Sequence, residues 1–382
     1  MTVYIFFTLF AALTAVYMLF LFRLRAGLRN LAAEPTESLA VVDDLRHPFV
    51  TVLLPARNEE KHIAECIASM KAQRYPAGRM EVLLIDDNSE DATWERAESA
   101  IAGDSRFRCL HVNGAGKKSA ITLGVQKAQG EVIVATDADC LHNPDWLRAM
   151  TAPFAEGADI VAGPVVYSER RTLFQRFQAM EFLGLMGVGA GFFGIGYPRL
   201  CNGANLAYRK QMFTAVSGFE GNEGVHSGDD EFLLHKIVYR EGGKAEFVVR
   251  PEAVVSTTTA TSLRAFLGQR IRWASKGRQY DDTRFVSFLI LLFVYFLFAA
   301  ASPIVSVGSA AALILGLLFL ILKVIADTSI LYASAALFRQ PLRLPDLVAA
   351  EILHAYYLVF VSVIGFFGGF TWKNRRVRNR RS

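Results

Sequence analysis

Two aspartates separated by one residue, Asp137 and Asp139, closely follow a short apolar run. The run, Val132 to Ala135, is continuous and rich in β-branched residues, and Gly130 precedes it, which predicts a buried strand. Residues i and i+2 of an extended strand point to the same side, so these carboxylates could together hold one hard cation. A solvated turn after the strand is the alternative interpretation, because Asp is common in turns.

Other polar residues follow neighbouring predicted strands. The apolar run 50–55 precedes Glu59, and the apolar run 82–85 ends in Asp86 and Asp87. Strands and helical stretches alternate here with short turns, which predicts βαβ units and a parallel sheet. Open α/β sheets hold ligands at the carboxyl ends of their strands. The alternatives are an Asx-type turn for the aspartate pair and a helix-start role for Glu59.

Residues suited to phosphate binding and proton transfer lie in two further segments. Lys117 follows a glycine-rich loop and could approach phosphates as a point charge. Asp229 and Asp230 begin a predicted helix, where a carboxylate could act as a general base. Helix capping is the alternative role for the two aspartates.

A Gln-x-x-Arg-Trp sequence is formed by Gln269, Arg272 and Trp273. Arginine can bind a diphosphate through two parallel hydrogen bonds, and an indole face can stack on a sugar ring and exclude water. The neighbouring basic residues Arg264, Arg270, Lys276 and Arg278 also fit an amphipathic helix that docks on a membrane. The two interpretations are compatible.

An apolar, uncharged run from Val3 to Phe22 is long enough to cross a bilayer as a helix. Arg23, Arg25 and Arg29 follow it, which places this end of the span on the cytoplasmic side. A cleaved signal peptide is the alternative, but there the positive charges would precede the apolar run.

The C-terminal third is again mostly apolar. Spans fit at about 285–304 and 306–323, and a last one at about 347–370 precedes a basic tail. With the preceding domain in the cytoplasm, three spans would place this tail outside, against the positive-inside rule. Either residues 324–338 span separately or the last segment is re-entrant, and both possibilities stay open.

The net charge indicates which partner to expect, and the spacing of the cysteines indicates the redox compartment. The formal net charge is +5, and six basic residues lie in the tail between Lys373 and Arg381. A basic cluster beside an apolar segment favours anionic lipid over nucleic acid as the partner. The four cysteines form no C-x-x-C pair, which predicts neither a disulfide framework nor a zinc site and suits a reducing compartment.

Seven elements in this order resemble the membrane-bound family 2 glycosyltransferases of GT-A fold. They are Pro55-Ala-Arg-Asn-Glu59, Asp86-Asp87, Gly116-Lys117, Asp137-Ala-Asp139, Gly203-Ala-Asn205, Gly228-Asp229-Asp230 and Gln269-x-x-Arg272-Trp273. The resemblance covers about residues 48–280. It implies an α/β, Rossmann-like nucleotide-diphospho-sugar transferase domain with flanking transmembrane helices.

The organisation that follows has five parts. They are an N-terminal transmembrane helix (1–24), a linker (25–47), a cytoplasmic GT-A domain with interfacial helices (48–280), a C-terminal transmembrane region (285–370) and a basic tail (371–382). The expected location is the cell inner or plasma membrane, as a multi-pass protein.

The resemblance also implies residue roles. Asp230 matches the catalytic base, and Asp229 precedes it where the family more often has Glu. Asp137 and Asp139 are expected to hold Mg²⁺ or Mn²⁺, and Asp137 also to meet the donor. The other donor-binding residues would be Glu59, Asp86, Asp87 and Lys117, and the acceptor or diphosphate would meet Gln269, Arg272 and Trp273.

The implied activity is inverting transfer of a sugar from a nucleotide-diphosphate sugar, expected to be a UDP-sugar, to a lipid or glycan acceptor at the membrane. A processive polysaccharide synthase is the alternative, although the few spans have almost no polar residues for a polymer path. A non-catalytic membrane scaffold would not need the complete set of carboxylates. A phosphoryl or nucleotidyl transferase would not need the Gln-x-x-Arg-Trp element.

Overall fold

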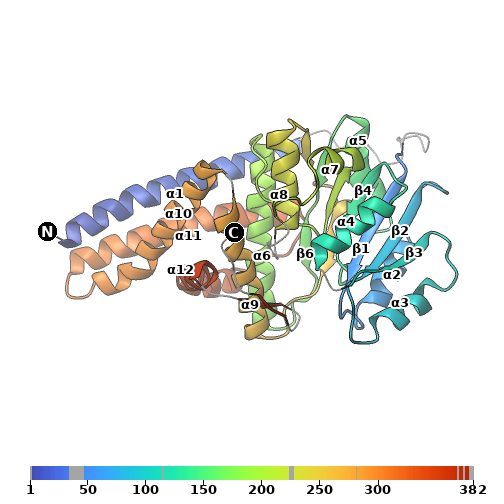
Figure 1. Ribbon diagram of the computed structural model, residues 1–382. Coiled ribbons are helices and arrows are strands. Elements are labelled where there is room, and N and C mark those ends of the chain that lie inside the picture. The colour runs from blue at the N-terminus through green and yellow to red at the C-terminus, as the bar shows by residue number, and fades with distance from the viewer. Residues whose placement is uncertain are drawn as a thin grey trace.

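The computed structural model has an α/β part from which long helices project on one side (Figure 1). The structure describes residues 2–33, 47–113, 116–222, 228–280, 282–367, 370–372 and 375–377. Most of the expected linker and of the basic tail therefore lies outside the described residues.

A seven-stranded mixed sheet forms the centre of the α/β part, in the order β3-β2-β1-β4-β7-β5-β8. Strands β1 to β4 run parallel, and β7 is antiparallel to both β4 and β5. The bounds are β1 (Val50–Ala56), β2 (Met80–Asp86), β3 (Phe107–His111), β4 (Val132–Ala135), β5 (Ile160–Ala162), β7 (Leu206–Arg209) and β8 (Ala245–Phe247). The strands predicted from the apolar runs are thus confirmed, and β2 and β4 are wholly buried, as strands covered on both faces should be.

Helices cover this sheet, and a second, two-stranded sheet pairs β6 (Val165–Tyr167) with β9 (Val255–Thr257). The helices are α2 (Ile63–Lys71), α3 (Thr93–Ile101), α4 (Lys117–Lys127), α5 (Trp146–Ala155), α7 (Lys210–Ala215) and α8 (Asp229–His235), and α8 continues into a π-helical turn (Lys236–Arg240). Gly124 lets α4 lie directly on the sheet, because a Cβ there would come within 3 Å of Leu53 and Ile85. This contact places the first residue of α4, Lys117, at the carboxyl edge of the sheet.

Three helices are long and apolar enough to cross a membrane, namely α1 (Thr2–Ala33), α10 (Thr283–Val305) and α11 (Ala310–Leu337). They run side by side away from the α/β part (Figure 1). Aromatic rings join them, as where Phe6 stacks on Phe298 of α10 with centroids 4.7 Å apart. Large apolar side chains such as Leu19 and Ile314 face outward and are exposed, which suits contact with lipid.

The first helix is longer than the sequence predicts. It continues through residues 25–33, where the linker was expected to begin, because Leu24, Leu28 and Leu31 recur at helical spacing and are buried. This end of α1 packs on α6 (Leu173–Gly194) through glycines, since a Cβ on Gly194 would lie 2.0 Å from the carbonyl oxygen of Gly27. Small residues at such crossings allow helices to approach closely.

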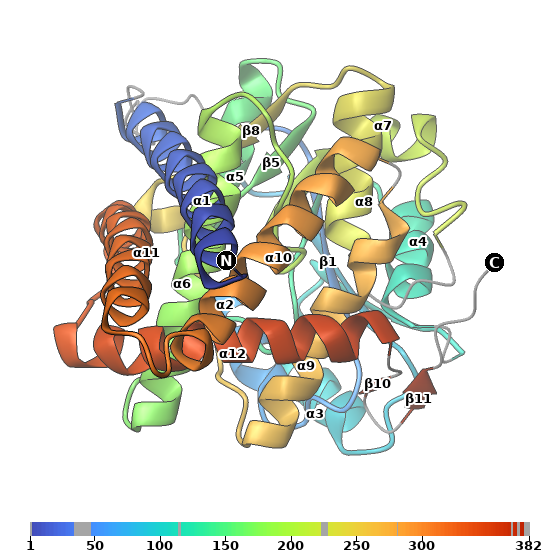
Figure 2. The same ribbon diagram turned by 90° about the vertical axis from the view of Figure 1, so that its left-hand side faces the viewer.

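Helix α12 (Leu344–Phe367) occupies the sequence of the last expected span, but it lies across the other three helices. Figure 1 shows α12 end-on while α1, α10 and α11 extend across the page, and Figure 2 shows α12 along its length. Residues 324–337 belong to α11 and form no separate span. Because α11 returns the chain to the α/β part, α12 lies at the same end of the helices as the sheet.

The glycine contact between α1 and α6 can be tested by mutation. We expect Gly194→Val to lower the free energy of unfolding by about 1–3 kcal/mol, because the added side chain would overlap the backbone of α1. Thermal unfolding of the full chain in detergent would measure the effect.

Gly268→Ala is the matched control, because a Cβ at Gly268 meets no heavy atom within 4 Å in the described part of the chain. It should leave the Tm unchanged or slightly raised, since alanine favours helix. Equal Tm values for the two variants would contradict the described packing.

Candidate active site

The strand ends and three helices meet at one end of a cavity of about 1070 Å³, which also extends between the apolar helices. The helices are α4, α8 and α9 (Leu263–Ser275), and α9 contains the Gln-x-x-Arg-Trp sequence. Of the predicted site residues, Glu59, Asp87, Lys117, Asp137, Asp139, Asp229, Asp230, Gln269, Arg272 and Trp273 line the cavity. Asp86 does not line it.

Asp86 and Asp87 at the end of β2 have different surroundings. The Asp86 carboxylate accepts hydrogen bonds from the N–H of Ser89 (3.2 Å) and from its hydroxyl (2.5 Å). It therefore closes the turn after β2, which is the alternative that the sequence left open. Asp87 faces the cavity, and its Oδ1 accepts a hydrogen bond from the N–H of Gly116 at 3.1 Å. This bond ties the end of β2 to the start of α4.

Glu59 lies in the turn between β1 and α2, ahead of the first helical residue Ile63. Its backbone N–H donates to Oγ1 of Thr93 at 2.7 Å, and the residue lines the cavity. The carbonyl of Glu59 accepts the N–H groups of His62 and Ile63 at 2.9 and 3.0 Å, so Glu59 also takes part in the start of the helix, which is its alternative role.

Asp137 and Asp139 lie in the turn after β4, because the strand ends at Ala135. The extended-strand argument for their common direction therefore does not apply, although both line the same cavity. The backbone N–H of Cys140 donates to the carbonyl of Asp137 at 3.1 Å and closes this turn.

Lys117 lies among the carboxylates. Its Nζ is 2.5 Å from Oδ1 of Asp137 and 3.7 Å from Oδ2 of Asp229, so one cation joins the ends of β4 and the start of α8. Burial alone would lower the pKa of Lys117, but these two carboxylates raise it above its usual value. The amine is therefore protonated at neutral pH.

Asp230 is held at the start of α8. The N–H of Gly203 donates to its Oδ2 and the N–H of Glu231 to its Oδ1, both at 2.8 Å. Gly228 occupies the N-cap position, so neither aspartate is the capping residue. Burial, together with Asp229 and Glu231, raises the pKa of Asp230 to about 6, although Lys276 and Lys117 act in the opposite direction. A carboxylate with this pKa is suited to accept a proton near neutral pH.

Glu231 and Lys276 were missed by the sequence reasoning as site residues. Nζ of Lys276 lies 2.7 Å from Oε1 of Glu231, and the hydroxyl of Tyr280 donates to the same carboxylate. Both Glu231 and Lys276 line the cavity. The available signal was that Glu231 directly follows the aspartate pair and that Lys276 lies one helical turn after Arg272.

The Gln-x-x-Arg-Trp helix is attached to its neighbours through Arg270. This buried guanidinium bonds Glu181 of α6 at 3.0 Å and Oε1 of Gln269 at 2.5 Å, and it lies 4.2 Å from the ring of Trp273. The hydroxyl of Tyr357 on α12 also donates to Glu181, at 3.2 Å. Helices α6, α9 and α12 therefore meet beside the cavity.

A mixed α/β sheet with acidic residues gathered at its strand ends is compatible with a nucleotide-dependent transferase, and comparisons with known proteins show what the chain is similar to. Residues 51–213 match the family described as Glycosyl transferase family 2. An N-acetylglucosaminyltransferase of Rhizobium leguminosarum bv. phaseoli is 28% identical over 233 residues, which cover 59% of this chain and 54% of that protein. Glycosyltransferase AglE of Haloferax volcanii is 31% identical over 123 residues, 32% of this chain and 40% of that protein. The chain thus spans about half the length of the curated relatives it matches.

Among solved structures, the mannosyltransferase PcManGT from Pyrobaculum calidifontis, in complex with GDP-Man and Mn²⁺, has the same fold. The TM-score is 0.57 at 20% identity, and the match covers 94% of this chain and 98% of that one. Residues 51–213 are therefore a Glycosyl transferase family 2 domain, and the chain has a GT-A fold with helices long and apolar enough to cross a membrane.

The environment of Asp230 predicts the pH dependence of catalysis. If Asp230 acts as the base, kcat/KM should fall as the pH drops through about 6, because the carboxylate becomes protonated. Lys276→Met removes a charge that lowers this pKa, so the acid limb should move to higher pH. The measurement is the pH profile of donor turnover by the full chain.

Lys276→Arg keeps the charge and should leave the acid limb near its wild-type position. An acid limb that does not move in Lys276→Met would show that Lys276 does not act on the titrating group.

Proposed function

We propose that this protein transfers a sugar from a nucleotide-diphosphate sugar to a hydroxyl of a lipid acceptor, with inversion at the anomeric carbon. The observation that carries the proposal is the extent of the cavity. It reaches from Asp230 to apolar side chains of α10 and α12, such as Leu292 and Val361. A lipid lying between these helices would present its polar end to the catalytic carboxylates.

The donor would lie at the strand ends. Glu59 and Asp87, which line the cavity, would meet the base and ribose, whereas Asp86 would act on the donor only through the turn that it closes. Arg272 and Trp273 would meet the diphosphate and the sugar, and Gln269 the acceptor side. The related mannosyltransferase was solved with GDP-Man, so a guanosine donor stands beside the uridine donor that the family resemblance implies.

Asp137 and Asp139 are the residues proposed to hold Mg²⁺ or Mn²⁺. Their carboxylate oxygens suit hard divalent cations, and the solved relative contains Mn²⁺. A bound cation would neutralise charge that develops on the leaving diphosphate. Lys117, which now pairs with Asp137, would supply a further positive charge beside the phosphates.

The bond changes follow from this arrangement. The acceptor oxygen attacks the anomeric carbon and forms the new glycosidic bond, and its proton passes to Asp230. The bond from the anomeric carbon to the diphosphate oxygen breaks, and the nucleoside diphosphate leaves with the electron pair. Attack on the face opposite the leaving group inverts the configuration, which NMR of the product would report.

The same geometry supports a location in the cell inner or plasma membrane, with the α/β part in the cytoplasm. Arg23, Arg25 and Arg29 lie at the end of α1 that packs on the α/β part, and α12 leads the chain into the basic tail at this same end. Three spans, with α12 lying across them, would then satisfy the positive-inside rule. The N-terminal end of α1 would lie on the opposite side.

A single transfer is favoured over polymer export. The halves of α1, α10 and α11 that are distant from the sheet contain no charged residue (residues 2–16, 294–305 and 310–322). A polymer leaving through the helices would need a polar path along them.

The proposal is tested by turnover of the full chain in detergent with GDP-mannose, UDP-glucose and UDP-N-acetylglucosamine, with and without Mn²⁺, in the presence of membrane lipid. We expect one donor to be consumed and a glycosylated lipid to form. Asp230→Asn should lower kcat by about 10²–10⁴-fold, the usual contribution of a general base, and leave the KM of the donor nearly unchanged. Asp139→Asn should abolish the effect of Mn²⁺.

Asp145→Asn is the control, because Asp145 forms a surface ion pair with Arg74 and does not line the cavity. Wild-type turnover in both Asp230→Asn and Asp139→Asn would contradict the assignment.

A further inference from the structure

No basic residue lines the membrane-facing half of the cavity in the described part of the chain. We define this half by the lining residues of α1, α10, α11 and α12, and in the described parts of these helices none of them is Lys or Arg. Most are apolar, such as Phe288 and Leu292, and the acidic ones are Asp327 and Glu351. Charges interact strongly in such a low-dielectric place, so an anionic group of a lipid would be repelled there.

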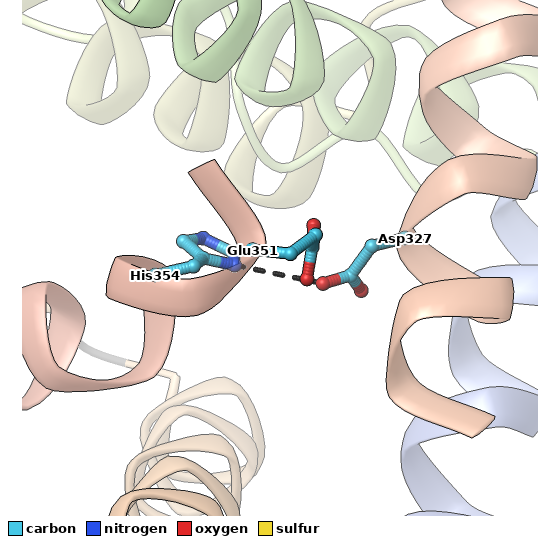
Figure 3. A group of neighbouring side chains, drawn as sticks. All are labelled: Asp327, Glu351 and His354. Atoms are coloured by element: carbon cyan, nitrogen blue, oxygen red, sulfur yellow. Dashed lines mark ion pairs between the residues drawn. The ribbon is translucent and has the colours of Figure 1, made fainter. Parts of the chain in front are cut away.

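The two carboxylates belong to a buried cluster that we call the polar node, formed by Tyr17, Lys323, Asp327, Glu351 and His354. Nζ of Lys323 lies 2.7 Å from Oδ2 of Asp327 and also pairs with Glu351. Nδ1 of His354 lies 3.5 Å from the same oxygen of Asp327, and the hydroxyl of Tyr17 donates to that carboxylate. Figure 3 shows Glu351 and His354 of α12 directed toward Asp327 of α11.

A metal ion does not fit the polar node as it stands. The ligand atoms of Asp327, Glu351 and His354 lie within 4.8 Å of one another, a spacing that a cation could bridge. However, the ammonium group of Lys323 already pairs with both carboxylates and supplies the positive charge.

The polar node is open to the cavity through His354. This side chain keeps 26% of its surface exposed and lines the cavity together with Asp327 and Glu351. Its Nδ1 faces Asp327 and Lys323, while its Nε2 has no hydrogen-bond partner in the described part of the chain. Polar groups among membrane helices are costly and commonly mark a substrate route. A purely hydrocarbon segment of lipid would leave this nitrogen unsatisfied.

The catalytic half of the cavity also suits an uncharged acceptor. Lys117 pairs with Asp137, Arg270 with Glu181, Lys276 with Glu231 and Arg57 with Asp87, so four of the six basic residues that line the cavity in the described part of the chain have an acidic partner. Of the other two, Arg272 is assigned above to the donor diphosphate, and Lys118 donates to the backbone carbonyl of Asn222. A lipid phosphate, whose second pKa is about 6, is largely ionised at neutral pH and would attack without a base. A hydroxyl must lose a proton, which explains a buried carboxylate at Asp230.

We propose, on the basis of the lipid-acceptor function above, that the acceptor is an uncharged lipid with two polar points and not a lipid phosphate. One point is the hydroxyl that attacks the sugar at Asp230. The other is a hydrogen-bonding group nearer the acyl chains, such as an ester or amide, which binds at His354 and Glu351 of the polar node.

Three probe lipids distinguish an acceptor with two polar points from one with a hydroxyl alone and from a lipid phosphate. Each lipid is added to the full chain in detergent, together with the donor that the protein turns over. Dioleoylglycerol has a hydroxyl and esters, oleyl alcohol has a hydroxyl alone, and undecaprenyl phosphate has a phosphate. We expect kcat/KM to be about tenfold higher for dioleoylglycerol than for oleyl alcohol, the effect of about one buried hydrogen bond. Transfer to undecaprenyl phosphate should not be detected.

Variants at the polar node test whether it causes the preference for dioleoylglycerol over oleyl alcohol. His354→Leu should reduce the ratio between dioleoylglycerol and oleyl alcohol toward one, and His354→Gln, which keeps a hydrogen-bonding group, should restore most of it. The KM of the donor should not change in either. Tyr356→Phe is the control on the same helix, because Tyr356 is exposed and does not line the cavity.

The experiment distinguishes a failure of this inference from a failure of the lipid-acceptor function. Efficient transfer to undecaprenyl phosphate, or an equal effect of His354→Leu on both hydroxyl lipids, would overturn this inference and leave the lipid-acceptor function intact. Donor turnover with no transfer to any of the three lipids would overturn the proposed function and this inference with it.

Discussion

Repulsion among carboxylates gathered in one cavity is the constraint on which the rest of the site depends. Asp137, Asp139, Asp229 and Asp230 line this cavity at the carboxyl edge of the sheet, and burial raises the pKa of Asp230. The fold places cations among them, with Lys117 between Asp137 and Asp229 and with Lys276 at Glu231. The carboxylate of Asp230 is left with a pKa of about 6, close enough to neutrality for proton transfer. A divalent cation and a diphosphate would enter a site in which charge is already nearly balanced.

The second constraint is the packing of α6 against the apolar helices and against α9. Glycines bring α6 against α1, and Glu181 of α6 holds both Arg270 of α9 and Tyr357 of α12. The helix with the Gln-x-x-Arg-Trp sequence is therefore positioned by residues that also orient α12. This arrangement lets one cavity reach both the strand ends and the apolar helices. In the proposed function, the donor and the lipid would therefore bind in the same cavity.

Much of this architecture could be predicted from the sequence, because it depends on local patterns. Continuous apolar runs marked β1, β2 and β4, and uncharged stretches marked α1, α10 and most of α11. The predicted site residues do gather at one cavity, with Asp86 as the exception, since its place in a turn depends on the orientation of Ser89. The family match over residues 51–213 covers the motifs from Pro55 to Asn205 and ends before those at Asp230 and Trp273.

The remaining features depend on contacts between distant segments. Glu231 meets Lys276, and Lys323 meets Glu351, across separations that periodicity does not report. The extension of α1 depends on its packing against α6, and hydropathy alone did not separate α12, which lies across the bundle, from a further span.

The most direct measurement of the central claim is a structure of the full chain in a lipid nanodisc with Mn²⁺ and the nucleoside diphosphate product of its active donor. The account predicts the metal at Asp137 and Asp139, and ordered lipid density that passes between α10 and α12 and ends in a polar group next to Asp230. Density for the nucleotide with side chains closing the cavity between Asp230 and α10, and with no lipid there, would contradict it.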